Sequence, residues 1–503
     1  MNDKTRNAPP RAGAVLEALR GLGYSTASAL ADIIDNSISA GASEVDIRFV
    51  WEGPRSRILV IDNGRGMTDS ELESAMRLGD KSPLDERHRD DLGRFGMGMK
   101  TASLSQCRRL TVASIREGGS LCCLRWDLDE IAARPDGGWL LFEGPAAGSE
   151  SVLAMLERRR SGTLVVWELL DRIVTRGFAA DDFLNIIDNV ERRLAMVFHR
   201  LLAGSHAALR LTLNDRPVEA WDPFMTGHNS KPWNSPVTRL TTSSGVIEVE
   251  CHVLPHRDRL TQVEHELAAG PEGWTAQQGL YVYRNRRLLL AGGWLGLGQG
   301  KAWNREEAHR LARIRVDIPN TADAEWKIDI RKSTARPPVA IRPWLTKLAE
   351  DTRERARRVF AFRGAPVALA GGGPIEQAWR VDRSGTGIRY QIDQKHPAVA
   401  AVLEATGAAA PLVKAMLRVI EETVPVQRVW LDTAENKETP RTGFSGQPRE
   451  RVLEVLETIY ADMLGRRGMS SEDAKRMLRS MEPFQAYPEL IGALAIPTAP
   501  DSR

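Results

Sequence analysis

The sequence predicts an α+β protein in which helices cover one face of a mainly antiparallel sheet. Apolar residues in the segment 25–40 recur at helical spacing and define one apolar stripe. The stripe comprises Leu30, Ile33, Ile34 and Ile38. Short apolar runs at 45–51 and 57–62 are typical of strands, with a Gly-Pro turn between them, and a second hairpin is expected over 109–128. Strands joined by tight turns pair antiparallel, which sets the fold class.

Three domains are expected along the chain. The first covers residues 1–180 and contains the strands above. A helical segment leads to a second module, residues 205–362. The strands expected in that module are 209–214, 246–254, 279–285 and 313–319. The Gly/Pro/Ala-rich stretch 363–374 is a linker candidate, and residues 375–503 are expected to be mostly helical.

The composition is that of an ordinary globular protein. Hydrophobic residues make up 42% and charged residues 27% of the 503 positions. Lys and Arg (69) barely exceed Asp and Glu (66), so net charge alone does not argue for nucleic-acid binding. The four cysteines form no C-x-x-C pair, which favours structural thiols over a metal site. Because the N-terminus is polar and the apolar run 288–297 is short, we expect a cytoplasmic protein without a membrane span.

The segment ADIIDNS (31–37) places two chemically useful side chains on one helix face. Asp32 and Asn36 are four positions apart, roughly opposite the apolar stripe. A carboxylate can orient and deprotonate a water molecule, and an amide oxygen can bind Mg²⁺. Asp35 is an alternative base, although we favour Asp32. A solvated helix face explains the same pattern without any function.

The segment DNGRGM (62–67) directly follows an apolar strand. Its Asp62 can accept a hydrogen bond from an exocyclic amine such as that of adenine. Gly64 and Gly66 allow the backbone to approach a flat ring, and Met67 completes the predicted binding segment. Taken alone, the D-x-G-x-G pattern also fits an ordinary turn after a strand.

The glycine cluster GRFGMGMKT (93–101) is typical of close backbone approach to phosphate. A helix that begins near Met99 would direct its backbone N–H groups at an anion. The predicted binding residues of this cluster are Gly93, Gly96, Gly98, Met99, Lys100 and Thr101. The spacing fits neither a dinucleotide fingerprint nor a Walker A loop. Further along, Thr163 opens a strand, where its hydroxyl can bond a base or a bound water.

Taken in order, these four segments resemble the GHKL (Bergerat-fold) ATPase pattern shared by gyrase, MutL, MORC proteins, heat-shock chaperones and histidine kinases. The resemblance covers about residues 12–175. It implies an ATP site in which Asp32 is the general base and Asn36 holds Mg²⁺. It also implies that Asp62 reads adenine, that the three glycines form a phosphate lid and that Thr163 supports the adenine. Many members carry Glu where this chain has Asp32, and the shorter side chain implies slow hydrolysis.

The second module resembles the βαβ transducer domain of gyrase, MutL and MORC proteins, chiefly in GLYVYRNRRLLLAGGWLG (279–296). In those families a transducer lysine reaches the γ-phosphate. The segment 326–338 offers Lys327 and Lys332, and we favour Lys332 because it lies at a basic, turn-like end. Such a lysine would distinguish ATP from ADP, since only ATP supplies a third phosphate. The alternative is that both lysines are surface residues of an edge strand.

Within the family, the chain resembles bacterial MORC-like and heat-shock-like proteins, which implies ATP-dependent closure of a homodimer. The resemblance also implies DNA or a DNA-acting protein as partner, in restriction, silencing, phage defence or DNA maintenance. Basic runs at 158–160, 284–287 and 353–358 are either DNA contacts or solvated faces. The alternative functions are a chaperone-like ATPase and a nucleotide-gated scaffold with little hydrolysis.

Overall fold

The chain forms two compact units, residues 1–363 and 364–503. The structure is a computed structural model. It describes residues 10–79, 98–134, 138–204, 208–228, 233–323, 325–329, 332, 334–361, 376–384, 387–427, 429, 444, 449–481, 483–484 and 487–496. The candidate site lies entirely within the first unit.

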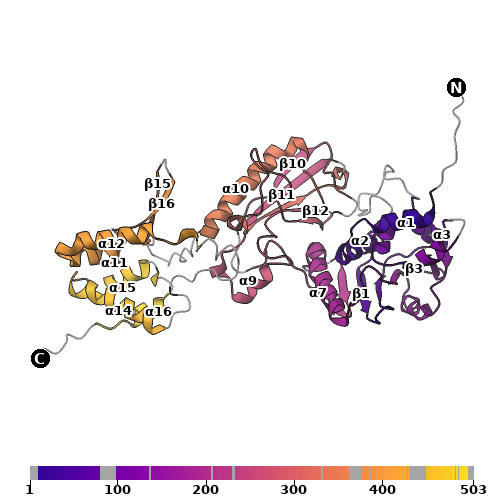
Figure 1. Ribbon diagram of the computed structural model, residues 1–503, viewed down its shortest axis with the longest axis horizontal. Helices are drawn as coiled ribbons and strands as arrows, with labels where there is room; N and C mark the ends of the chain where they lie inside the picture. The colour runs from indigo at the N-terminus through magenta and orange to yellow at the C-terminus, as the bar shows by residue number, and fades with distance from the viewer. Residues whose placement is uncertain are drawn as a thin grey trace, which may run out of the picture. The chain divides into compact units, whose positions relative to one another are not determined.

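Among the described residues, eight strands form a largely antiparallel sheet in the N-terminal part of unit 1 (Figure 1). In spatial order they are β5 (Phe142–Glu143), β4 (Cys122–Asp127), β3 (Arg109–Ile115), β6 (Gly162–Glu168), β2 (Arg57–Asp62), β1 (Glu44–Val50), β7 (Arg210–Leu213) and β8 (Arg216–Pro217). Strands β1 and β2 form the first predicted hairpin, and β3 and β4 form the second. Because β6 pairs with β2, the strand that carries Thr163 lies beside the strand that ends at Asp62.

Both faces of this sheet are covered. Successive residues of β2 point to opposite faces, so that Val60 joins the main core and Ile61 a smaller apolar layer. Helix α2 contributes Leu30 and Ile34 to the main core, and both are fully buried. The helices of this region are α1 (Ala12–Arg20), α2 (Thr26–Ser39), α3 (Asp69–Met76), α4 (Gly98–Leu104), α5 (Leu128–Ala132), α6 (Ala154–Glu157), α7 (Ala180–Val197) and α8 (His199–Leu202).

A second, mixed sheet follows within unit 1. Its strands in spatial order are β10 (Thr238–Thr242), β11 (Gly245–Val253), β14 (Ala312–Asp317), β12 (Gly279–Arg284) and β13 (Arg287–Ala291), with β9 (Trp233–Asn234) paired to β11. Helix α10 (Arg342–Ala361) packs on β11 and β14, while α9 (Gln262–Ala268) precedes β12. The turn between β12 and β13 has positive φ at both Asn285 and Arg286, the geometry of a two-residue type I′ hairpin.

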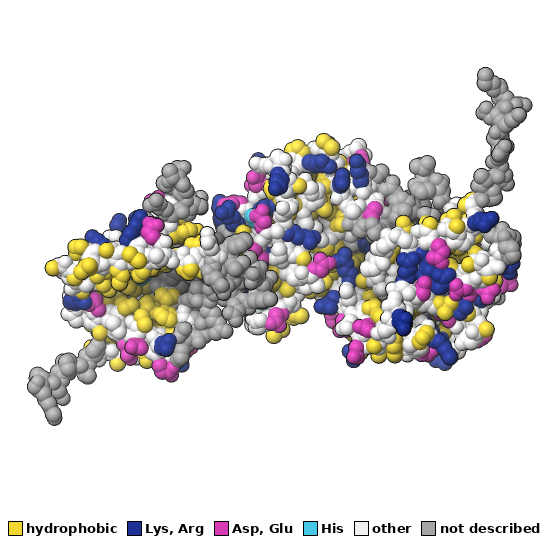
Figure 2. Space-filling view, in the orientation of Figure 1, with side chains coloured by type: hydrophobic (Ala, Val, Ile, Leu, Met, Phe, Trp, Pro, Cys, Tyr) yellow, Lys and Arg dark blue, Asp and Glu magenta, His cyan; other side chains and the backbone are white. Residues whose placement is uncertain are grey.

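Unit 2 combines a two-stranded hairpin with helices. Its elements are β15 (Trp379–Ser384), β16 (Gly387–Ile392), α11 (Pro397–Ala405), α12 (Ala410–Glu422), α14 (Arg449–Gly465), α15 (Ser471–Ser480) and α16 (Pro488–Ala493). Exposed apolar side chains gather on α11 and α12 (Figure 2), namely Val402, Leu412, Met416 and Val419. In the part of the chain that the structure describes, no single helix is long and apolar enough to cross a membrane. The bent pair 397–405 and 407–422 meets that length and composition test only jointly.

The predicted α+β class, with a mostly helical C-terminal region, is confirmed. The prediction for the strand 209–214 is wrong in one respect, since it is expected in the second module. In the structure this run forms β7 of the first sheet, parallel to β1. The chain returns to this sheet through α7 and α8, and such a helical crossover is what a parallel pairing requires.

Candidate active site

Asp62 lies at the end of β2 and is almost fully buried, with 5% of its surface exposed. One carboxylate oxygen accepts hydrogen bonds from the backbone N–H groups of Gly64, at 2.9 Å, and Thr163, at 3.2 Å. The other accepts a hydrogen bond from the Ser37 hydroxyl of α2 at 2.8 Å. Burial raises the pKa of Asp62, and these hydrogen bonds oppose the shift. The structure therefore assembles three sequence-distant segments around one carboxylate.

The loop after Asp62 runs very close to strand β3. Gly66 has φ +67°, and a Cβ at this position would lie 1.9 Å from the carbonyl oxygen of Ile115. The N–H of Met67 donates to the Ser114 hydroxyl at 2.9 Å, and the same hydroxyl lies 3.0 Å from that of Thr163. The sequence predicts that the backbone at Gly66 approaches a flat ring. In the structure it approaches the backbone of strand β3.

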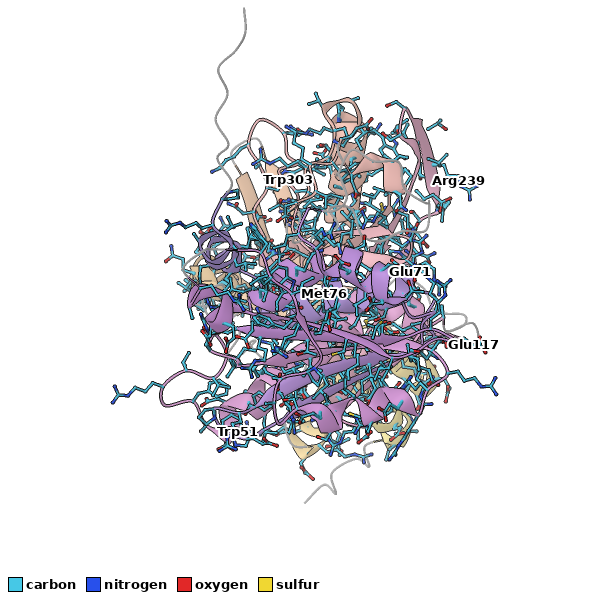
Figure 3. All side chains as sticks on the ribbon, turned by 90° about the vertical axis from the view of Figure 1, so that its right-hand side faces the viewer. Trp51, Glu71, Met76, Glu117, Arg239 and Trp303 are labelled. Carbon is cyan, nitrogen blue, oxygen red and sulfur yellow. The ribbon has the colours of Figure 1, made fainter. Side chains whose placement is uncertain are left out.

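The exit of this loop is fixed by the start of α3. Thr68 and Glu71 form a capping box, in which each side chain bonds the backbone of the other residue. Glu71 also pairs with Arg116 at 3.1 Å, at the edge of the sandwich where Figure 3 labels Glu71 and Glu117. These contacts tie the loop to both α3 and the β3–β4 hairpin.

Replacing Gly66 with alanine is expected to cost several kcal/mol of stability. An alanine in the left-handed region loses about 1–2 kcal/mol by itself, and the clash with the Ile115 carbonyl adds to this. Gly53→Ala is the matched control, because Gly53 has φ +58° but nothing within 4 Å of the added Cβ. Urea unfolding of both variants measures the difference. Equal losses in the two would show that the close approach at Gly66 carries no energetic weight.

Asp32 lies on the buried side of α2, with 5% of its surface exposed. The hydroxyl of Tyr24 donates to one of its oxygens at 3.0 Å, and the ammonium of Lys332 donates to the other at 2.8 Å. Burial and the Asp32 charge raise the pKa of Tyr24, so the phenol stays protonated and acts as the donor. Asn36, one turn further on, is exposed, and its side chain makes no hydrogen bond to any residue that the structure describes.

Asp35, the alternative base, is held by two cations from the second sheet region. Arg287, the first residue of β13, donates from Nε to both Asp35 oxygens at 3.1 Å. Lys332 donates to Asp35 at 2.5 Å, so its ammonium bridges Asp32 and Asp35. Burial alone would raise the pKa of Asp35, but the charges of Arg287 and Lys332 hold it below its ordinary value.

The described part of the glycine cluster begins with α4. Gly98 opens this helix, and a Cβ added there would lie 3.9 Å from Asp32, which places the start of the helix beside that carboxylate. Met99 is half-buried and packs against the main core. Lys100 is buried and donates to the carbonyl oxygens of Ala75 and Arg77, both at 2.8 Å, so its ammonium faces the end of α3.

The other predicted residues of the cluster are placed as follows. The Thr101 hydroxyl donates to the carbonyl of Gly98 at 3.3 Å, within the first turn of α4. The remaining two glycines of the predicted lid, Gly93 and Gly96, lie outside the described residues. Of the two candidate lysines, Lys327 is exposed, whereas the Lys332 side chain is only 12% exposed. Their predicted roles toward a nucleotide stay predictions, but only Lys332 is placed against the acidic residues of α2.

Three residues of the assembled site were missed from the sequence. Ser37 ends the segment ADIIDNS but received no predicted role, and Tyr24, just before the same helix, was not singled out. Arg287 was counted in a basic run interpreted as either a DNA contact or a solvated face, and both ideas are wrong for it and for Arg284. Arg287 is buried on Asp35, and Arg284 is buried in an ion pair with Asp323.

Residues 24–163 match the protein family described as "Histidine kinase-, DNA gyrase B-, and HSP90-like ATPase". Among curated proteins, the chain is similar to the DNA mismatch repair protein MutL of Rhodospirillum rubrum, with 39% identity over 190 residues, 38% of this chain and 26% of that protein. The MutL of Sphingopyxis alaskensis is 30% identical over 132 residues, 26% of this chain and 20% of the relative. The MutL of Halobacterium salinarum is 37% identical over 90 residues, which are 18% of this chain and 14% of that protein.

The chain thus spans about a quarter or less of the length of these relatives. The family match begins at Tyr24 and ends at Thr163, which are both residues of the assembled site. It therefore covers the segments that surround Asp62 and Asp32, and it stops short of Lys332 and Arg287. Residues 24–163 therefore match a GHKL-type ATPase domain, and part of the chain is similar in sequence to MutL.

Proposed function

We propose that this protein binds and hydrolyses ATP, and that the second sheet region reads the state of the nucleotide. The observation that carries the proposal is the bridge from Lys332 to Asp32 and Asp35. It places a cation of one sheet region against the helix of another, in the segment where the family resemblance puts the hydrolytic water. The two predicted catalytic groups thus meet although they are 300 positions apart.

In this proposal Asp62 accepts a hydrogen bond from the adenine amine, and Thr163 supports the base beside it. Asp32 takes a proton from the attacking water, while Tyr24 keeps the carboxylate oriented. Asn36 fits an Mg²⁺ ligand, because its amide oxygen is exposed on the same helix and no described side chain occupies it. Mg²⁺, when bound, would offset the negative charge of the phosphates.

In this proposal ATP acts as a switch because its γ-phosphate competes with Asp32 and Asp35 for the ammonium group of Lys332. Without nucleotide, Lys332 is held by two carboxylates. The γ-phosphate of ATP offers an alternative anion, and ADP does not. When Lys332 moves to the phosphate, Asp32 loses its cation and becomes available as a base. ATP binding would therefore both report to the second sheet region and expose the hydrolytic group.

Replacing Lys332 with methionine is expected to abolish the preference for ATP over ADP, which should be about tenfold or more in the wild type. Methionine is also unbranched but one atom shorter, and it lacks the charge that distinguishes the two nucleotides. Lys327→Met is the matched control, because this exposed lysine comes from the same segment and should leave the preference unchanged. Calorimetric titration with a non-hydrolysable ATP analogue and with ADP measures both. An unchanged preference in Lys332→Met would refute the sensor role.

We further propose duplex DNA as the partner of an ATP-closed homodimer. The relatives are named as DNA mismatch repair proteins, which favours DNA maintenance over a defence role. The closer affinity to MORC-like proteins stays a prediction. Arg284 and Arg287 of the run 284–287 are buried, so the exposed Arg355 and Arg357 of α10 are the better candidates for phosphate contacts.

Fluorescence anisotropy with duplex DNA at several salt concentrations tests this proposal. We expect saturable binding that weakens steeply with salt, and a slope reduced by about two in Arg355→Gln/Arg357→Gln. Arg216→Gln, on the short edge strand β8, is an exposed control. Binding that is absent or insensitive to salt would contradict DNA as the partner.

A second candidate is a nucleotide-gated scaffold that binds ATP with little turnover. Two observations favour it. The presumed base is an aspartate, shorter than the glutamate of many relatives, and Lys332 already neutralises it in this structure. Tight ATP binding without phosphate release would select this function, and the assignments of Asp62 and Lys332 would survive.

A further inference from the structure

Arg287 is more deeply buried than Lys332 and has more contacts. It directly follows the tight Asn285–Arg286 turn, which fixes the start of β13. Its guanidinium bonds both oxygens of Asp35 and the carbonyl of Leu288, at 2.7 Å, and lies 5.9 Å from the ring centre of Phe198. The side chain is 5% exposed, compared with 12% for that of Lys332.

The four charged groups at α2 form a balanced cluster. Asp32 and Asp35 carry two negative charges, and Arg287 and Lys332 carry two positive ones. Arg287 is centred on Asp35, since its closest approach to Asp32 is 3.7 Å. Lys332 is shared between both carboxylates. If Lys332 leaves, Asp35 keeps its hydrogen bonds to Arg287 at 3.1 Å, whereas Asp32 keeps the Tyr24 hydroxyl and only a longer contact with Arg287, at 3.7 Å.

We propose that Arg287 is a positioning residue for hydrolysis, because it holds Asp35 as a permanently paired anion and so makes Asp32 the carboxylate that Lys332 uncovers. The inference rests on the proposed function above, in which Lys332 moves to the γ-phosphate. It adds the reason why one carboxylate of the pair acts as the base and the other does not. It also implies that Arg287 sets how readily Lys332 is released, since Asp35 without its arginine would retain the lysine.

Arg287→Met tests this idea through the ratio of the dissociation constants for ADP and a non-hydrolysable ATP analogue. We expect the ratio to fall about tenfold, because Lys332 now neutralises two otherwise unpaired carboxylates and resists transfer to the phosphate. Arg286→Met removes an exposed arginine one position away and should leave the ratio unchanged.

The double variant Asp35→Asn/Arg287→Met separates this electrostatic role from mechanical anchoring of β13. It lacks the ion pair, just as Arg287→Met does, but it also lacks the anion that retains Lys332. We expect the ATP preference to return to within about threefold of the wild type, with measurable phosphate release. A ratio as low as in Arg287→Met would show that the arginine acts only as an anchor and would overturn the inference.

If Arg287→Met does not fold, the double variant still buries no unpaired charge, and a ratio far below that of the wild type in it would overturn the inference. An unchanged ratio in a folded Arg287→Met would also overturn the inference. Failure of the proposed function looks different. In that case the wild type itself would show no preference for the ATP analogue, whatever the variants do.

Discussion

Asp32→Asn is expected to lower steady-state ATP turnover by about 100-fold or more, while ATP is still bound. The amide keeps the size of the side chain and can still accept the Tyr24 hydrogen bond, but it cannot take a proton from water. The proposed nucleotide contacts of Asp62 and Thr163 do not involve Asp32 and should persist. The variant therefore separates chemistry from binding, which few other substitutions in this site can do.

Phosphate release and calorimetric ATP titration measure the two effects on the same preparation. Asp188→Asn, an exposed carboxylate on α7, is the control and should retain wild-type turnover. Turnover that survives Asp32→Asn but disappears in Asp35→Asn would transfer the role of base to Asp35. That result would also contradict the role given to Arg287, which depends on Asp35 staying paired.

Asp62→Asn is expected to weaken the binding of ATP and ADP alike by about 100-fold, or about 2.7 kcal/mol. The two backbone donors, Gly64 and Thr163, require an acceptor, so the asparagine oxygen should turn toward them. Its NH₂ group then faces Ser37 and the base. The Ser37 hydroxyl can rotate and accept a hydrogen bond from this NH₂ group. The adenine amine cannot, because it is a donor itself and would face another donor.

The fold should survive this change, because the N–H groups of Gly64 and Thr163 and the Ser37 hydroxyl still find partners. Thermal unfolding without nucleotide should therefore move by only a few degrees. Calorimetric titration gives the affinities, and Asn63→Ser, at the neighbouring half-buried position, is the control for disturbance of the loop. ATP binding of wild-type strength in Asp62→Asn would remove Asp62 from the adenine site.

The motif residues could be identified from the sequence because local patterns fix their surroundings. The end of β2 places Asp62 at a strand terminus, and the hairpin signals correctly placed the neighbouring strands. The family resemblance assigned Asp62 and Thr163 to one adenine site, but it did not predict the direct hydrogen bond between them, which spans 101 positions. Helix α2 was likewise predicted within one residue at each end, from its apolar stripe.

Other features depend on long-range pairing that leaves no local signal. Strand β7 has the same apolar pattern whether it joins the first sheet or the second, and only its parallel register with β1 decides. Arg287 looked like a surface charge because its partner, Asp35, is 252 positions away. The sequence pattern also hardly distinguishes Lys332 from Lys327. In the structure Lys332 is largely buried against Asp32, whereas Lys327 is exposed.

Steady-state phosphate release by the wild-type chain from Mg·ATP tests the central claim most directly, namely that this site hydrolyses ATP and uses the nucleotide as a switch. We expect slow, saturable release that stops in Asp32→Asn. ATP that binds tightly but yields no phosphate, with or without duplex DNA, would contradict hydrolysis and leave a nucleotide-gated scaffold.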